Sequence, residues 1–174
     1  MTQAELLDRL PSILRADVLE ARELICGQAV ARIGRSAVPD ALAVLRDHPD
    51  TRFEMLSDLT VVDYLGRVPR FEVVYVLYSL AQRHRLRVKV AVPEEDAIVP
   101  TVSSVWKAAG WAEREAWDMY GVRFAGHPDL RRILMYPEFE GHPLRKDYPV
   151  ARRQPLIAER DPLARPRSAR ESAA

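Results

Sequence analysis

The stretch RFEVVYVLYSL, residues 70–80, decides the fold of this chain. Apart from Glu72, apolar residues occupy both the odd and the even positions from Phe71 to Tyr78. Side chains of a strand point alternately to its two faces, so this strand would be apolar on both. Such a strand needs cover on both sides, and we therefore expect it to be central in a sheet.

Two further β-rich runs flank this strand, at residues 53–63 and 85–92. In the second run, Leu or Val at even positions alternates with Arg or Lys at most odd positions, which predicts one buried and one wet face. Gly66 and Pro69 separate the first two runs, and polar residues 82–84 separate the last two. Such short links favour an antiparallel meander, and helices must then cover its exposed apolar face.

The N-terminal region predicts a helix followed by two strands. Thr2 and Glu5 form a capping box, and we expect the helix that starts there to end at Pro11. Residues 18–23 and 29–33 are predicted to be short strands that turn at Gly27. A second helix is predicted to start at Pro39. Its apolar stripe consists of Val38, Ala41, Leu42 and Leu45.

Two helical segments are predicted beyond the meander. Thr101 can cap the first of them, which would end at Gly110. The second covers residues 112–120 and would end at Gly121, because glycine is typical of the position after a helix. The apolar stripe of the first segment consists of Val102, Val105, Trp106 and Ala109.

The chain is therefore predicted to be an α+β protein with a single small domain. Its sheet is mixed and mainly antiparallel, helices flank it, and an extended C-terminal arm follows. We assign residues 1–121 to the core domain, 122–150 to an extended partner-binding arm and 151–174 to a loosely ordered basic tail. Seven of the 13 prolines lie after residue 121, and that part carries 11 Lys or Arg against 7 Asp or Glu. Without a periodic apolar pattern it cannot bury enough surface to order itself alone.

Composition excludes several classes of function. The net charge of +1 provides no overall field for nucleic acid or anionic lipid. The single cysteine, Cys26, rules out an intrachain disulfide, and we expect it to be a small buried apolar residue. The polar opening MTQAELLDRL does not resemble a signal peptide. The longest apolar run has six residues, at 73–78, so we expect membrane contact only through a partner.

Residues 111–150 contain every dense cluster of potential chemistry. Glu113, Glu115 and Asp118 are interpreted as a charged helix face that pairs internally or with a partner. His127 and His142 each lie in a Gly-His-Pro turn, and we expect the imidazole to pin the turn by hydrogen bonds. The alternative is a zinc site with Asp129, Glu138 or Glu140, although no HExxH pattern is present. We expect Arg131, Arg132, Arg145 and Lys146 to pair with carboxylates across an interface.

The same residues resemble a known family. The match comprises Glu113-Arg114-Glu115, Asp118-Met119-Tyr120-Gly121, Phe124, residues 126–134 (GHPDLRRIL) and residues 141–149 (GHPLRKDYP). These motifs are similar to the signature of the C-type subunit, or 30 kDa subunit family, of proton-pumping NADH–quinone oxidoreductase (respiratory complex I). The resemblance is looser over residues 53–110, weak before residue 50 and absent after about residue 151.

The resemblance implies a structural subunit of the hydrophilic arm, without catalytic residues, metal or cofactor of its own. The complex as a whole would use NADH, FMN, iron–sulfur clusters and a quinone such as ubiquinone, and would translocate protons. The implied partners are the large quinone-site subunit (the D-type subunit) and neighbouring cluster-bearing subunits, with no nucleic acid. The implied location is peripheral, on the cytoplasmic face of the bacterial inner membrane, or the matrix side in an organelle.

The resemblance also implies which residues bind partners. They are Glu113, Arg114, Glu115, Asp118, Tyr120, Gly121, Phe124, His127, Pro128, Arg131, Arg132, Gly141, His142, Pro143, Leu144, Arg145, Lys146, Asp147 and Tyr148. Two alternatives stay open at this point. One is the equivalent subunit of a membrane-bound energy-converting hydrogenase or formate-lyase complex. The other is a free-standing metal-dependent hydrolase that uses His127, His142 and Glu115.

Overall fold

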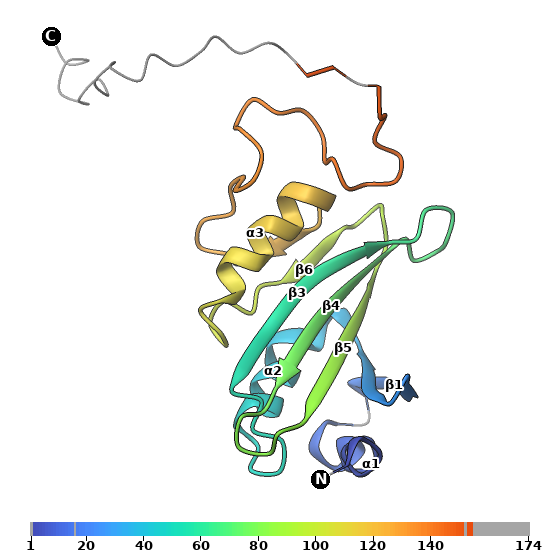
Figure 1. Cartoon of the computed structure of the whole chain (residues 1–174), viewed down its shortest axis with the longest axis vertical. Coiled ribbons are helices and arrows are strands. Elements are labelled where there is room, and N and C mark those ends of the chain that lie inside the picture. Colours follow the sequence, from blue (N-terminus) through green and yellow to red (C-terminus); the bar gives the residue numbers. More distant parts are fainter. Residues whose placement is uncertain (1, 16, 152, 155–174) are drawn as a thin grey trace, which may run out of the picture.

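The computed structural model describes residues 2–15, 17–151 and 153–154. A five-stranded sheet in the order β1-β2-β5-β4-β3 forms the centre of the fold (Figure 1). Its strands are β1 (Leu19–Ile25), β2 (Gln28–Ile33), β3 (Met55–Asp63), β4 (Phe71–Tyr78) and β5 (Arg85–Val92). Within this sheet only β2 and β5 pair in parallel, so the sheet is mixed and mainly antiparallel, as predicted.

Strand β4 lies between β3 and β5, which confirms the interpretation of residues 70–80. Phe71, Val73, Tyr75 and Leu77 point to one face and are at most 1% exposed. On the opposite face Glu72 and Val74 are each 8% exposed. The meander β3-β4-β5 is antiparallel throughout. Its connections are too short for the crossover that parallel neighbours need.

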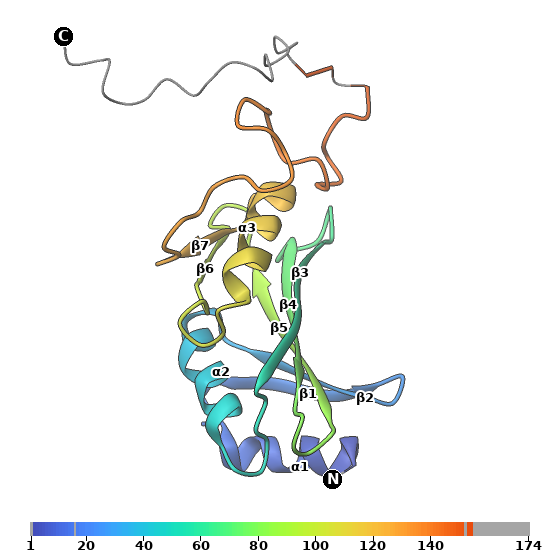
Figure 2. The ribbon, with the colours of Figure 1, turned by 60° about the vertical axis from the view of Figure 1, so that its left-hand side comes forward.

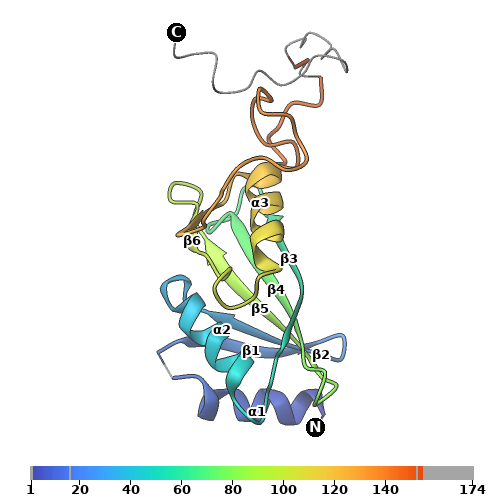
Figure 3. The ribbon, with the colours of Figure 1, turned by 90° about the vertical axis from the view of Figure 1, so that its left-hand side faces the viewer.

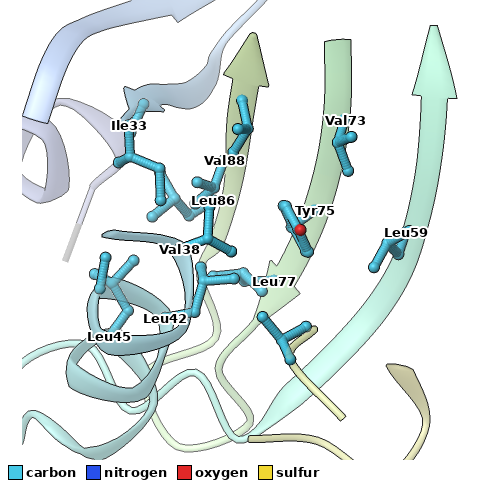
Figure 4. Close-up of a cluster of buried hydrophobic side chains, with 14 of the residues drawn as sticks. Ile33, Val38, Leu42, Leu45, Leu59, Val73, Tyr75, Leu77, Leu86 and Val88 are labelled. Carbon is cyan, nitrogen blue, oxygen red and sulfur yellow. The ribbon is translucent and has the colours of Figure 1, made fainter. Parts of the chain in front are cut away.

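Helices α2 (Val38–Asp47) and α3 (Ala109–Tyr120) cover one face of this meander. Figures 2 and 3 show both helices on the same side of β3, β4 and β5. The predicted stripe of α2 is buried, and Figure 4 shows Val38, Leu42 and Leu45 directed at sheet residues such as Leu77 and Leu86. The predicted helix with Pro39 in its first turn is confirmed.

The first helix, α1 (Gln3–Ile13), has the predicted capping box between Thr2 and Glu5. Its end was predicted wrongly, since the helix continues through Pro11 for two more residues. Proline has no N–H for the carbonyl of Leu7, which would otherwise stay without a helical donor. The guanidinium of Arg22 on β1 donates to that carbonyl instead, and so removes one cost of a proline inside a helix.

The helix predicted from Thr101 to Gly110 is wrong. Residues 101–108 form turns, and Gly110 lies inside α3. The apolar spacing was nevertheless informative, because Val102, Trp106 and Ala109 are buried. The predicted end of α3 is correct, since Gly121 adopts φ 82° at its C-cap.

Two further differences concern short segments. Cys26 is exposed in the tight β1–β2 turn, at φ 47°, so the expectation of a buried cysteine is wrong. Strands β6 (Ile98–Pro100) and β7 (Arg123–Ala125) form a parallel pair that was not predicted. Because Val99 and Phe124 are at most 2% exposed, this small sheet belongs to the core. Most of the region assigned as a basic tail, 151–174, lies outside the described residues.

Candidate partner-binding site

Residues 126–151, called here the C-terminal segment, contain no helix or strand. The segment starts beside β7, passes along α3 and reaches the end of the sheet near the β3–β4 turn (Figures 1 and 2). It can hold this course without regular structure only if its backbone and charges find partners in the core domain. Two carboxylates of the core provide those partners, Asp118 and Asp63.

The Asp118 carboxylate at the C-terminal end of α3 is fully buried. One oxygen, Oδ2, accepts hydrogen bonds from three successive backbone amides, those of Ile133, Leu134 and Met135, at 2.9–3.0 Å. The other oxygen accepts from Nη1 of Arg132 at 2.6 Å. A single side chain therefore fixes four consecutive residues of the segment.

These hydrogen bonds determine the charge state of Asp118. Burial alone would raise the pKa of this carboxyl. The bonds from the amide of Met135, from Arg132 and from the amides of Ile133 and Leu134 together outweigh burial and lower the pKa below its ordinary value. The carboxylate is thus ionised at neutral pH, which makes its hydrogen bonds charge-assisted and strong.

The backbone around Asp118 also holds the second Gly-His-Pro turn. Nδ1 of His142 donates to the backbone carbonyl of Asp118 at 2.9 Å, and Arg132 donates to the carbonyl of Gly141 at 3.1 Å. A Cβ atom at Gly121 would lie 2.7 Å from Cδ2 of His142. Glycine is therefore required at position 121 both for its positive φ and for the approach of the imidazole.

Arg114 ties the segment to the middle of α3. Its guanidinium donates to the backbone carbonyls of Arg131 and Arg132, at 3.1 and 3.0 Å. The same group lies over the ring of Trp111, at 5.1 Å from the centroid. Arg114 thus donates hydrogen bonds to two backbone carbonyls that have no partner in a β-sheet. Both carbonyls belong to its own chain.

The second anchor is Asp63, at the end of β3. Asp63 and Arg70 are 3% and 4% exposed and form a bidentate pair with distances of 2.8 and 2.9 Å. The backbone amide of Lys146 donates to Oδ2 of Asp63 at 2.8 Å. Arg70 also contacts Asp147 of the segment, at 2.8 Å from Nη2 to Oδ1.

Further charges extend this cluster to the surface. Arg145 pairs with Glu94 at 2.5 Å and with Asp147 at 3.1 Å, and Glu94 in turn accepts from Arg70 at 2.6 Å. Hydrogen bonds from Arg70 lower the pKa values of Asp63 and Asp147. The two ends of the segment are therefore fixed to different parts of the core domain by ionised groups.

A third buried carboxylate, Glu113 of α3, holds the loop that precedes this helix. Its carboxylate accepts from the backbone amide of Val102 at 2.7 Å and from the hydroxyl of Thr101. Burial raises the pKa of Glu113. The two hydrogen bonds and the nearby His127 act to lower this pKa, but the effect of burial is larger. Glu113 therefore fixes Thr101 and Val102 at the start of the loop that replaces the predicted helix.

His127 pins the first Gly-His-Pro turn, as expected. Its Nδ1 accepts from the amide of Asp129 at 3.0 Å, which leaves Nε2 to donate to the carbonyl of Gly110 at 3.0 Å. Both histidine rings are thus engaged with backbone groups. Among the described residues no cluster of three or more His, Cys, Asp or Glu side chains could hold a metal ion.

The structure corrects the expected role of several charged residues. Asp118 pairs internally with Arg132, as the interpretation of a charged helix face allows, but Glu113 and Asp118 are both buried and also accept hydrogen bonds from backbone amides. Arg132 and Arg145 pair with carboxylates of their own chain and not across an interface in this structure. Sequence reasoning could not show this, since the three amides that bind Asp118 come from residues with no charge of their own.

The remaining signature residues divide by exposure. Phe124 is in the core, Tyr120 packs against it, and Tyr148 stacks on Phe139 with 6.0 Å between ring centroids. Gly141 and Pro143 are half-buried. Glu115, Pro128, Arg131, Leu144, Lys146 and Asp147 are exposed.

Two leucines of the segment are held with their side chains in solvent. Leu134 is 57% exposed although its amide is bonded to Asp118. Leu144 is 52% exposed although its amide donates to the carbonyl of Met119 at 3.0 Å. The partner-binding set implied by the resemblance does not include Leu134, although Leu134 lies within the matched residues 126–134. Sequence reasoning missed Asp63 and Arg70 as anchors, because this long-range pairing cannot be read from spacing.

A family profile identifies the chain. The family described as respiratory-chain NADH dehydrogenase, 30 Kd subunit, matches residues 31–154. The chain belongs to this family. No helix among the described residues of this 30 kDa-family chain is long and apolar enough to cross a membrane.

Similar proteins agree with this assignment. The 30 kDa-family chain is 43% identical over 171 residues to the C-type subunit, numbered 2, of NADH-quinone oxidoreductase from Rhizobium etli (strain CIAT 652), covering 90% of this chain and 89% of that protein. It is 46% identical over 143 residues to the C-type subunit of NADH-quinone oxidoreductase from Geobacter sulfurreducens (strain ATCC 51573 / DSM 12127 / PCA), covering 82% and 86%. The relatives are thus subunits of an enzyme complex.

Two solved structures resemble the fold. A trypsin-resistant fragment (1–134) of Nqo5 is 34% identical with a TM-score of 0.62, covering 75% of this chain and 100% of the fragment. A chain from the membrane-bound sulfane sulfur reductase, described as an archaeal respiratory membrane complex, is 25% identical with a TM-score of 0.72. That match covers 85% of this chain and 86% of the other.

Proposed function

We propose that this chain is a structural, non-catalytic subunit in the hydrophilic arm of an NADH–quinone oxidoreductase. In that role it docks against the large quinone-site subunit and keeps it in register with the cluster-bearing subunits. The chain holds no cofactor itself, whereas the complex uses FMN, iron–sulfur clusters, NADH and a quinone. The hydrophilic arm is peripheral to the proton-translocating membrane part of the complex, on the cytoplasmic or matrix side.

The observation that carries the docking proposal is the arrangement of Leu134 and Leu144. Each has its backbone amide bonded to the core domain while more than half of its side chain is exposed. Exposed leucines held in fixed positions cost no further backbone ordering when a partner covers them. Because only about half of each side chain remains to be covered, burial would contribute about 0.8–1.6 kcal/mol for each leucine, which makes them candidate anchors of an interface.

The signature residues then take two roles. The buried ones, Asp118 and Arg132 among them, position the segment. The exposed ones, such as Arg131 and Lys146, contact the partner around the two leucines. A polar rim around an apolar centre is the usual composition of a protein interface.

A scaffold of this kind affects electron transfer without contributing to its chemistry. Transfer between centres depends on their separation, so the subunit that fixes neighbouring subunits also influences the rate. Buried ion pairs suit this purpose, since the Asp118–Arg132 and Asp63–Arg70 pairs hold the segment in one geometry. We infer that the anchors set the precision of docking more than its strength.

The second candidate is the equivalent subunit of another respiratory membrane complex, such as an energy-converting hydrogenase or formate-lyase complex. The similarity to a chain of the sulfane sulfur reductase complex favours keeping this candidate. Both candidates use the same docking surface, and they differ in the reaction of the complex.

Purification of the tagged chain from solubilised membranes tests the proposal. We expect the large quinone-site subunit to co-purify, and the native band to reduce a dye with NADH. A band with hydrogen-linked or sulfur-linked activity would favour the second candidate. Recovery of the chain alone, from cells that contain the complex, would contradict both.

A further inference from the structure

The face of the sheet opposite to α2 and α3 is not covered by a helix of the described chain. Figure 1 looks onto this face, and no helix passes in front of β4 and β5. The exposed Arg85 and Arg87 of β5 point to it. The register places Arg85 beside Tyr78 and Arg87 beside Val76 of β4, and Val30 of β2 lies on the other side of Arg87.

The two arginines differ from the other cations of this face. Lys89 pairs with Glu72 at 2.9 Å, and Arg32 lies 3.8 Å from Glu23. Within the described residues, Arg85 and Arg87 pair with no carboxylate; the guanidinium of Arg85 lies over the Tyr78 ring at 5.3 Å. Two guanidinium groups are thus available on one strand face.

A hollow lies between these arginines. It has a volume of about 230 Å³ and is lined by Gln28, Ala29, Ser57, Val76, Arg85 and Arg87. Met55 of β3, which lies opposite Tyr78 of β4 in the register, is 46% exposed at the side of this hollow. The surface therefore combines two free cations with an apolar floor, a hydroxyl and an amide.

We propose that this surface binds a helix of a neighbouring subunit that carries two carboxylates one turn apart. Residues two apart on a strand are separated by about 6.6–6.8 Å and point the same way. Residues three or four apart on a helix lie about 5–6 Å apart on one face, so their carboxylates can each reach one guanidinium. The apolar floor between the arginines then receives the aliphatic side chains of the same helix.

Charge excludes the other simple occupants. A second copy in a two-fold contact centred on the arginines would place arginine against arginine. The chain's own C-terminal residues 151–174 carry six Arg against three acidic residues and would be repelled. Nucleic acid needs more cations than two over an apolar floor, because its binding depends on many phosphate contacts. The proposal rests on the proposed function, since it requires a neighbouring subunit.

Charge reversal in the assembled complex tests this inference. The variant Arg85→Glu/Arg87→Glu is compared with Lys107→Glu/Arg123→Glu, which reverses two exposed cations away from this face that also pair with no carboxylate of the described residues. We expect the first variant to melt like wild type but to leave the purified complex at lower salt, with binding at least about tenfold weaker. If charge reversal disturbs folding, the neutral variant Arg85→Gln/Arg87→Gln replaces it, and this variant should also leave the complex at lower salt than wild type.

The outcomes separate this inference from the proposed function. Salt resistance equal to wild type in both Arg85/Arg87 variants would overturn the inference. If a Leu134→Asp/Leu144→Asp variant is nevertheless lost from the same complex, the docking proposal stays intact. RNA binding by the isolated chain that depends on Arg85 and Arg87, with an unchanged complex, would also overturn it. Equal weakening by the Lys107/Arg123 control would show a general charge effect and contradict it as well.

Discussion

The substitution Asp118→Asn removes one charge at the point where four residues of the C-terminal segment are fixed. An asparagine keeps the size of the side chain but presents an NH₂ group to one set of donors. If its oxygen faces the three amides of residues 133–135, its nitrogen faces the guanidinium of Arg132, which is only 14% exposed. We therefore expect Arg132 to lose its partner and the amide bonds to lose their charge assistance.

Breaking a buried ion pair from one side costs about 3–5 kcal/mol. The cost falls on docking of the segment, because Asp118 becomes hydrated when the segment leaves. A change of about 1.4 kcal/mol in free energy corresponds to a factor of ten in an equilibrium constant. The equilibrium constant for opening of the segment should therefore increase by about 10²- to 10³-fold or slightly more. Global melting should change less than segment opening.

Native-state hydrogen exchange of the amides of Ile133, Leu134 and Met135 measures this opening directly. Trypsin cleavage at Arg131 and Arg132 gives an independent readout. The control is Glu115→Gln, which removes the same charge from an exposed position of the same helix and should change protection less than about twofold. Unchanged protection of the three amides in Asp118→Asn would refute the reasoning.

Acid should reproduce the effect in the wild-type chain. The folded pKa of Asp118 lies below its ordinary value of 3.8, so the bonds contribute fully above that pH and are lost as pH falls further. Asp63 and Asp147 have lowered pKa values as well, so both ends of the segment should open together in acid. Segment protection in the wild type that is independent of pH below 3.8 would contradict this.

Three further predictions concern other residues of the site. Arg70→Ala should leave buried Asp63 unpaired, cost about 3–5 kcal/mol and lower the melting temperature by about 10 °C, whereas exposed Arg67→Ala should have little effect in the same thermal scan. Glu113→Gln should gain stability relative to wild type as pH rises above 4.5, because burial raises the pKa of Glu113 and the ionised form is disfavoured when folded. A constant difference between the two proteins from about pH 4 to about pH 7 would show that reasoning to be wrong. Gly121→Ala should displace the ring of His142, which is visible as a shift of its imidazole NMR signals, and lose at least about 1 kcal/mol of stability from the positive φ; an unshifted ring would contradict the predicted clash.

The parts of the fold that the sequence could predict are those with a local cause. Two-sided apolarity identified β4, the proline at position 39 identified the start of α2, and glycine at position 121 identified the end of α3. The segment at 101–109 shows the limit of this approach. Its apolar spacing is correct for burial, but residues 101–108 form turns, and Glu113, which holds this loop, comes from the following helix.

The candidate site depends on contacts that no local pattern contains. Arg70 and Asp147 are 77 positions apart in sequence, and the resemblance that drew attention to Asp147 says nothing of Arg70. Asp118 looked like a surface charge because sequence shows the ionised group and not the three backbone amides that donate to it. Proline at position 11 looked like a helix end because the compensating arginine comes from the next element.

The central claim is that the anchored segment presents Leu134 and Leu144 to the large quinone-site subunit. A photoreactive amino acid placed at position 144, and separately at 134, in the assembled complex tests this most directly. Each should cross-link to the large subunit, whereas the same probe at the exposed Val44 of α2, away from both proposed docking surfaces, should not. Cross-links from 134 and 144 that stay within this chain, in a complex that is active with NADH, would contradict the account.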